Sequence, residues 1–166
     1  MQPLVEIEES VHVAADPQLV WHLVTDVKRH PEFAGPRSIT KVVEFDGPIA
    51  EGAGWIAHER FGPQKFDAPS VITRVVDGHE LEWVSYPPMK EQNRGEGGRV
   101  FWRYTVEAEP GGTRLAHRMR VLPPAKGAWQ LKAMYAVLRL PRRQREGILT
   151  SLGNIKRAAE TQAHPV

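Results

Sequence analysis

The chain has 166 residues, which suits one domain with a substantial core, and its 41% hydrophobic and 25% charged residues exclude a disordered or collagen-like protein. The absence of cysteine excludes a disulfide, a thiolate metal site and a cysteine nucleophile. The formal net charge of +2 is small for a nucleic-acid-binding domain, so no nucleic-acid partner is expected.

The first part of the chain predicts a strand followed by two short helices. Apolar and polar residues alternate from Leu4 to Val13, as in a half-buried strand, and Glu9 breaks the pattern because it falls on the apolar face. Asp16 precedes a proline and an apolar stripe, which is typical of a helix start. Asp26 is expected to cap a second short helix that ends near Pro31.

Six further strand signals follow, separated by turn residues. They lie at about Ser38–Phe45, Trp55–Phe61, Phe66–Val76, Glu80–Tyr86, Arg99–Glu107 and Thr113–Leu122. Glycines at 78 and at 111–112 predict hairpin turns, because glycine readily adopts positive φ. Strands joined by short turns pair antiparallel, which excludes a βαβ arrangement.

The chain after Pro124 is rich in helix-forming residues, and two apolar stripes predict a long C-terminal helix. Pro141 lies between the stripes and should kink this helix or split it in two. One helix of ~10 Å diameter cannot cover a sheet of about seven strands. The rest of the apolar face must be filled by large side chains or left as a cavity.

Several short motifs, taken in order, resemble the START-like, or SRPBCC, superfamily, and in particular its polyketide cyclase/dehydrase and lipid-transport branch. They are Val13-Ala14-Ala15-Asp16-Pro17 with Val20-Trp21 and Val24-Thr25-Asp26, then Pro31-Glu32-Phe33, Gly111-Gly112-Thr113-Arg114-Leu115, and Leu152 to Glu160. The resemblance covers about residues 3–161 of a single domain, 1–166. It implies an α+β helix-grip fold, in which a curved antiparallel sheet of about seven strands surrounds a long C-terminal helix and a hydrophobic cavity lies between them.

Strand alternation selects the residues that we expect to line this cavity. The ligand-binding candidates are Glu9, Trp83, Ser85, Trp102, Met119 and, from the long helix, Met134, Tyr135 and Leu138. The alternative for each aromatic or methionine residue is that it simply fills the core. For Glu9, the alternative is an ion pair with an arginine or histidine.

His117, Tyr104 and Arg74 are the candidates for chemistry. A neutral imidazole donates and accepts hydrogen bonds and titrates near neutral pH, although His117 can also be a satisfied core histidine. The resemblance to aromatase/cyclases implies that Arg74 lies in the pocket, where it would stabilise an enolate oxygen. The tyrosine that accompanies this arginine in those enzymes is not found between Phe33 and Ser38, and a surface position is the alternative for Arg74.

Three functions are compatible with this sequence. The first is binding of a hydrophobic small molecule of lipid, polyketide or isoprenoid type. The second is a polyketide cyclase, aromatase or dehydratase that acts in the same cavity. The third is a non-catalytic interaction or membrane-surface adaptor that uses a basic run near the C-terminus. This run comprises Arg139, Arg142, Arg143 and Arg145. The alternative is that these arginines only form a solvated face of the helix.

The chain contains no sequence motif for phosphate binding, serine hydrolysis or zinc catalysis. There is no phosphate loop, nucleophile elbow or zinc motif, so no metal and no cofactor are predicted. His22 and Asp26 lie one helical turn apart, but two ligands do not make a metal site. No apolar run reaches the ~18 residues of a membrane span, and the first residues lack signal-peptide features, so a cytoplasmic protein is expected. The faces of His58 and Arg60 and the oligomeric state are left open.

Overall fold

The structure, a computed structural model, describes residues 2–34, 39–61, 63–86, 98–124 and 127–164. Within these residues, seven strands form one antiparallel sheet in the order β1-β7-β6-β5-β4-β3-β2. The strands are β1 (Val5–Val13), β2 (Ile39–Val43), β3 (Gly54–Phe61), β4 (Gln64–Val76), β5 (Glu80–Ser85), β6 (Arg99–Glu109) and β7 (Gly112–Leu122). The helices are α1 (Pro17–Thr25), the 3-10 helix η1 (Val27–Arg29), α2 (His30–Ala34), α3 (Ala128–Val137) and α4 (Leu140–Ala163).

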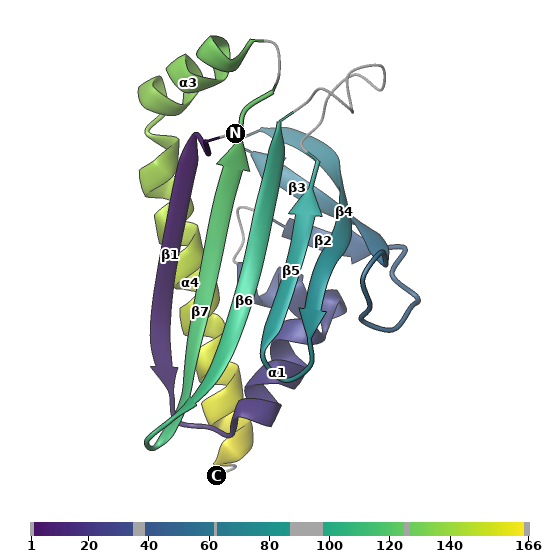
Figure 1. Ribbon diagram of the computed structural model, residues 1–166, viewed down its shortest axis with the longest axis vertical. Coiled ribbons are helices and arrows are strands. Elements are labelled where there is room, and N and C mark those ends of the chain that lie inside the picture. Colours follow the sequence, from purple (N-terminus) through teal and green to yellow (C-terminus); the bar gives the residue numbers. More distant parts are fainter. Residues whose placement is uncertain (1, 35–38, 62, 87–97, 125–126, 165–166) are drawn as a thin grey trace.

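The long C-terminal helix packs against the curved sheet, which confirms the expected helix-grip fold. Figure 1 shows α4 running beside β1 and β7, with α1 near its C-terminal end and α3 at the opposite end. The buried residues of α4 recur mostly every three or four positions, so they lie on one side of the helix. They are Leu140, Ile148, Ser151, Leu152, Ile155 and Ala159. The side-chain amide of Asn154 donates a hydrogen bond of 2.9 Å to the carbonyl of Phe33, which ties α4 to α2.

The predicted strand boundaries agree with the structure to within two residues, although Ser38, the predicted start of β2, lies outside the described residues. The first strand pairs with the last one, in a register that runs from Val5 opposite Val121 to Val13 opposite Thr113. Apolar residues of β1 are buried or half-buried and the polar ones between them are exposed, except that Glu9 is half-buried on the apolar face, as predicted.

The C-terminal helix is split in two, as Pro141 predicted. The break falls at Leu138 and Arg139, and Arg139 adopts a left-handed conformation with φ 49°. Pro141 itself lies in the first turn of α4, where its missing amide hydrogen would have had no helical partner. No helix within the described residues is both long and apolar enough to cross a bilayer.

The prediction for the second short helix is wrong in two respects. The chain does not leave helical geometry near Pro31, because η1 is followed directly by α2, which continues to Ala34. Pro31 is the second residue of α2, a position that tolerates proline. Asp26 makes no side-chain capping bond, whereas Asp16 accepts a hydrogen bond of 2.8 Å from the amide of Gln18, as predicted.

The hairpin between β6 and β7 packs tightly against the end of β1. A Cβ atom at Gly112 would lie 2.1 Å from the carbonyl oxygen of Val13, and Gly112 has φ +155°. The next residue, Thr113, is fully buried and its hydroxyl donates a hydrogen bond of 2.7 Å to the carbonyl of Ala15. The Gly-Thr pair therefore joins this hairpin to the connection between β1 and α1.

Replacing Gly112 by alanine should lower the free energy of unfolding by roughly 2 kcal/mol or more, because the added methyl group meets backbone atoms that cannot move aside. Gly153→Ala is the matched control. A Cβ at Gly153 has no neighbour within 4 Å, so this helical substitution should raise stability by about 0.5–1 kcal/mol. Urea unfolding followed by circular dichroism measures both variants, and unchanged stability of Gly112→Ala would contradict the close contact.

Candidate functional site

The inner face of β5, β6 and β7, which points towards α4, carries most of the residues that strand alternation selected. They are Leu81, Trp83 and Ser85 on β5, Trp102, Tyr104 and Val106 on β6, and Leu115, His117, Met119 and Val121 on β7. All of these are buried except Trp102, which is half-buried. The hydroxyl of Ser85 lies 2.8 Å from that of Ser70 on β4.

Aromatic rings surround His117. Its ring stacks on Tyr104, which is the directly opposite residue on β6, with centroids 4.2 Å apart and an interplanar angle of 27°. Trp102 and Trp83 lie with their ring centroids 5.6 Å and 6.3 Å from that of His117. Three strands thus bring the predicted residues His117, Tyr104, Trp102 and Trp83 into one group, which we call the His117 cluster.

Two members of the wider ring network were not singled out from the sequence. His30 lies 5.5 Å from Trp83 and 6.0 Å from Tyr104 between ring centroids, and Trp55 lies 5.9 Å from Trp83. The Nε2 of His30 donates a hydrogen bond of 2.9 Å to the carbonyl of Val24. Alternation along β3 could have identified Trp55, whereas His30 lies on α2, a helix of five residues that is too short to show a periodic pattern.

The His117 ring is uncharged at neutral pH. Burial and, to a smaller extent, the nearby His30 together lower its pKa to about 3. Burial also lowers the pKa of His30. Within the described part of the chain, neither ring nitrogen of His117 has a hydrogen-bond partner. A neutral imidazole has one N–H donor and one nitrogen acceptor, and the described residues use neither of them.

Tyr104 is held as a neutral phenol beside His117. Burial raises its pKa well above the ordinary range, and a hydrogen bond with Ser151 of α4 only partly opposes this. The pair therefore offers one hydroxyl and one neutral imidazole, and α4 contacts the cluster through Ser151.

Glu9 lies on β1 directly opposite His117 in the strand register, and its carboxylate forms an ion pair of 2.5 Å with Nε of Arg145 on α4. Its side chain is 21% exposed. The structure therefore has the ion pair that was the alternative for Glu9, and this pair connects the edge strand to the helix.

Glu59 is a second carboxyl group on the inner face. It follows the buried Trp55 and Ala57 on alternate positions of β3, and burial raises its pKa to about 7. Glu59 was not singled out from the sequence, although alternation from Trp55 places it on the same face.

Arg74 does not reach the His117 cluster. The pairing of β4 with β5 shifts between Ile72 and Arg74, so the alternation changes phase. Arg74 consequently points to the outer face, where it is 61% exposed and its Nε lies 2.9 Å from a carboxylate oxygen of Glu80.

Of the three candidates predicted on the C-terminal helix, one is buried and two are exposed. Tyr135 is buried, and its hydroxyl accepts a hydrogen bond of 3.1 Å from Nε2 of Gln144. Met134 and Leu138 are exposed on α3 and at the break, away from the cluster. On β3, His58 contacts Asp67 and lies, with the exposed Arg60, on the outer face.

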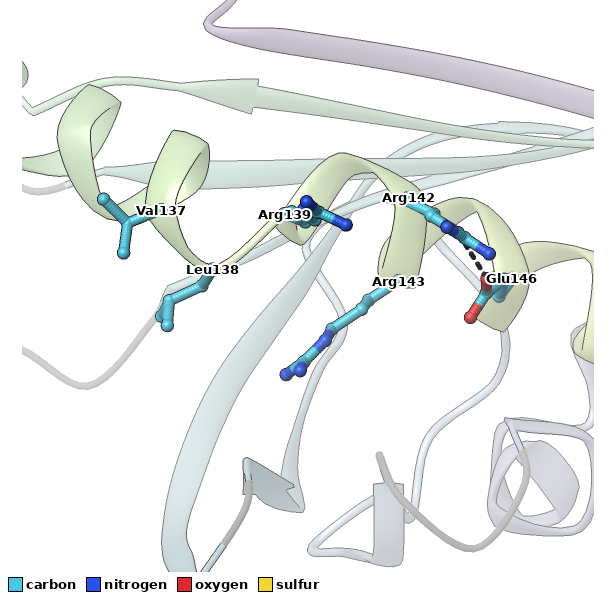
Figure 2. Close-up of a pocket in the computed structure, with 6 residues that line it drawn as sticks. All are labelled: Val137, Leu138, Arg139, Arg142, Arg143 and Glu146. Carbon is cyan, nitrogen blue, oxygen red and sulfur yellow. Dashed lines mark hydrogen bonds and ion pairs between the residues drawn. The ribbon is translucent and has the colours of Figure 1, made fainter.

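A hollow of about 390 Å³ lies at the break between α3 and α4 (Figure 2). It is lined by Val137, Leu138, Arg139, Arg142, Arg143 and Glu146. Among the residues that the structure describes, no group of three or more histidine, aspartate or glutamate side chains is placed to hold a metal ion.

Acidification should lower the free energy of unfolding more steeply in wild type than in the variant His117→Phe. Between the unfolded pKa of 6.5 and the folded pKa of about 3, the unfolded state binds a proton that the folded state excludes, so stability falls as the pH falls. His117→Phe should remove a slope of about 1.4 kcal/mol per pH unit. Urea unfolding at several pH values measures this slope, and a difference between the two proteins that does not vary with pH would contradict it.

Glu59 must be controlled for in this experiment, because its effect has the opposite sign. With a folded pKa of about 7 against 4.5, the folded state retains a proton that the unfolded state loses, so stability falls as the pH rises through this range. Glu59→Gln should therefore steepen the loss of stability on acidification, while His117→Phe flattens it.

Comparison with known proteins gives matches of structure only. No protein-family model and no curated protein sequence matches the chain. The Zhui aromatase/cyclase from Streptomyces sp. R1128 matches with a TM-score of 0.74 and 16% identity over 97% of this chain and 96% of that chain. The protein TTHA0849 from Thermus thermophilus matches with a TM-score of 0.71 and 12% identity over 96% of this chain and 100% of that chain.

A polyketide-cyclase-like protein from Corynebacterium glutamicum matches with a TM-score of 0.60 and 20% identity, over 97% of this chain and 94% of that chain. Identities this low establish similarity of fold. The structural matches therefore confirm the expected fold, which this chain shares with solved aromatase/cyclase and polyketide-cyclase-like proteins.

Proposed function

We propose that the protein binds a hydrophobic small molecule of lipid, polyketide or isoprenoid type between the sheet and α4, and that His117 recognises a polar atom of this molecule. The observation that carries the proposal is the His117 ring, which is only 5% exposed while no described residue hydrogen-bonds to either of its nitrogens. A buried polar group without a partner costs about 1–3 kcal/mol. A hydroxyl or carbonyl group of a ligand would remove part of this cost.

The surroundings of His117 favour a flat, apolar ligand. Tyr104, Trp83 and Trp102 present ring faces around the imidazole, with Trp83 and Trp102 stacked at an interplanar angle of 15°. Aromatic rings bind planar molecules through offset stacking and large apolar contact areas. A few polar groups within such a wall give orientation, and His117 and Tyr104 supply them here.

The ligand would approach from the end of the sheet where β6 begins. On the inner face of β6, Tyr104 and Val106 are buried, whereas Trp102 and Val100 are half-buried. Exposure of this face therefore increases towards Arg99, and Trp102 would lie between solvent and His117.

The electrostatics of the cluster favour binding over proton abstraction. With a pKa of about 3, His117 is a weak base at neutral pH, far from the value that suits a general base. Its neutral ring nevertheless remains a full hydrogen-bond donor and acceptor. We therefore assign His117 to ligand recognition.

Two probes of nearly equal size test this assignment: naphthalene, which is wholly apolar, and 2-naphthol, which adds one hydroxyl group. Wild type should bind 2-naphthol about tenfold more tightly than naphthalene, because one hydrogen bond to a buried group is worth about 1.4 kcal/mol. His117→Phe should bind both probes with equal affinity. Quenching of tryptophan fluorescence and equilibrium dialysis measure the affinities.

Arg74→Gln is the matched control, because it removes a polar side chain from the outer face of the sheet, and it should bind both probes as wild type does. Failure of the folded wild type to bind either probe would overturn the proposed apolar site. A preference for 2-naphthol that survives in His117→Phe would overturn the role of His117 alone.

The contact between Tyr104 and His117 supports a second candidate, a polyketide cyclase, aromatase or dehydratase. In a cyclisation, one imidazole nitrogen would take a proton from a methylene group between two carbonyls. The resulting enolate carbon would attack a carbonyl carbon of the same chain, and the proton would pass to the new alkoxide oxygen. The placement of Arg74 removes it from this mechanism, so Tyr104 would have to donate to the enolate oxygen.

A linear poly-β-keto thioester is the substrate that separates the two candidates. If the protein is a cyclase, wild type and Arg74→Gln form a cyclised product and His117→Phe does not, as measured by liquid chromatography and mass spectrometry. Binding of the thioester without product formation would exclude the cyclase and leave the binding function.

A further inference from the structure

Helix α3 exposes an apolar surface that the fold leaves uncovered. It attaches to the rest of the protein mainly through Tyr135, which is buried, and Leu131, which is half-buried. Trp129 is 71% exposed and Val137 is 79% exposed, and Met134 and Leu138 are also among the exposed large hydrophobic residues. Trp129 and Val137 are eight residues apart, so they lie on one side of the helix about 12 Å from each other.

Positive charge surrounds this apolar surface. From Gly127 to Arg145 the sequence has five lysine or arginine residues and no aspartate or glutamate. Arg145 is engaged by Glu9 and Arg142 by Glu146, but no described carboxylate pairs with Arg139 or Arg143. Exposed arginines without a carboxylate partner attract an anionic partner.

The apolar and basic groups meet at the break between the two helices. Val137 and Leu138 line the hollow of about 390 Å³ together with Arg139, Arg142 and Arg143. Figure 2 shows Arg142 against Glu146, whereas Arg143 extends away from α4. An anionic group with an attached hydrocarbon chain would satisfy both sides of this hollow.

We propose that the α3 surface, comprising Trp129, Val137, Leu138, Arg139 and Arg143, binds the surface of a membrane that contains anionic phospholipid. Trp129 and Val137 would enter the region between headgroups and acyl chains, and Arg139 and Arg143 would contact lipid phosphates. Exposed tryptophan together with arginine is the composition of interfacial helices. Each basic side chain near an anionic bilayer adds attraction that salt weakens.

A bilayer fits this surface better than a protein groove does. Apart from the side held by Leu131 and Tyr135, α3 is exposed nearly all round and presents a convex surface. Figure 1 shows it at one end of the molecule, beyond the ends of β1 and β7, where a flat surface can reach it. This proposal does not depend on whether the interior binds a ligand.

Vesicle sedimentation tests the proposal with two lipid compositions, pure phosphatidylcholine and phosphatidylcholine with phosphatidylglycerol as about a third of the lipid. Wild type should sediment with the anionic vesicles at low salt, should bind the neutral ones at least about tenfold more weakly, and should be released by high salt. The fluorescence of Trp129, which is more exposed than the buried Trp21, Trp55 and Trp83 and the half-buried Trp102, should shift to shorter wavelength on binding.

Two variants and a charge-matched control make the result specific. Trp129→Ala with Val137→Asp, and separately Arg139→Gln with Arg143→Gln, should each reduce binding to anionic vesicles by about tenfold or more. Arg74→Gln with Arg114→Gln removes the same charge from exposed positions elsewhere and should bind as wild type does. Unchanged thermal stability and far-ultraviolet circular dichroism would show that the α3 variants are folded.

Three results would overturn the proposal. The first is failure of wild type to bind anionic vesicles at low salt. The second is equal loss of binding in the charge-matched control. The third is a dimer in lipid-free solution that is abolished by Trp129→Ala with Val137→Asp, since a second copy of the chain would then cover the surface.

Discussion

One helix packs against a sheet that is wider than the helix, and the arrangement of the interior follows from this mismatch. The residues Ile148, Leu152 and Ile155 of α4 belong to the core, and α4 runs beside β1 and β7. Farther across the sheet, large aromatic rings line the interior instead, and Trp83 contacts rings from three other strands. The same rings therefore stabilise the fold and form the candidate site. Among these rings, His117 carries two buried nitrogens to which no described residue hydrogen-bonds.

The interior disfavours charge, whichever sign the charge has. Burial lowers the pKa of His117 to about 3 and raises that of Glu59 to about 7, and in both cases the uncharged form gains. The inner-face carboxylate of Glu9 remains paired, with Arg145 at the edge of the sheet. A ligand that enters this interior meets the same constraint, so neutral molecules with hydroxyl or carbonyl groups suit it better than carboxylates or amines.

Much of the fold and the centre of the site could be predicted, because apolar residues recur there with the regular period of a strand or a helix. Strict alternation along β6 and β7 places Tyr104 and His117 on one face, and no bulge disturbs their pairing. Arg74 could not be placed in this way, because the register shift beside Ile72 exchanges the two faces of β4. Met134 and Leu138 were assigned as if the helix continued, whereas the break at Arg139 gives α3 its own direction. His30 has no periodic neighbours, so only the tertiary structure brings it to Trp83.

The partnership of β1 with β7 sets the order in which the chain can fold. Every residue of β1 is separated from its partner by at least 100 residues, since Val13 faces Thr113 and Val5 faces Val121. The pairs from β2 to β7 join strands that are neighbours in sequence, so each closes a far shorter loop than the pairing of β1 with β7 does. On a ribosome, the first strand to be synthesised must therefore wait, unpaired, until the last strand has emerged. The Gly112–Thr113 contact with the end of β1 can form only at that late stage, when the N-terminal strand closes the sheet.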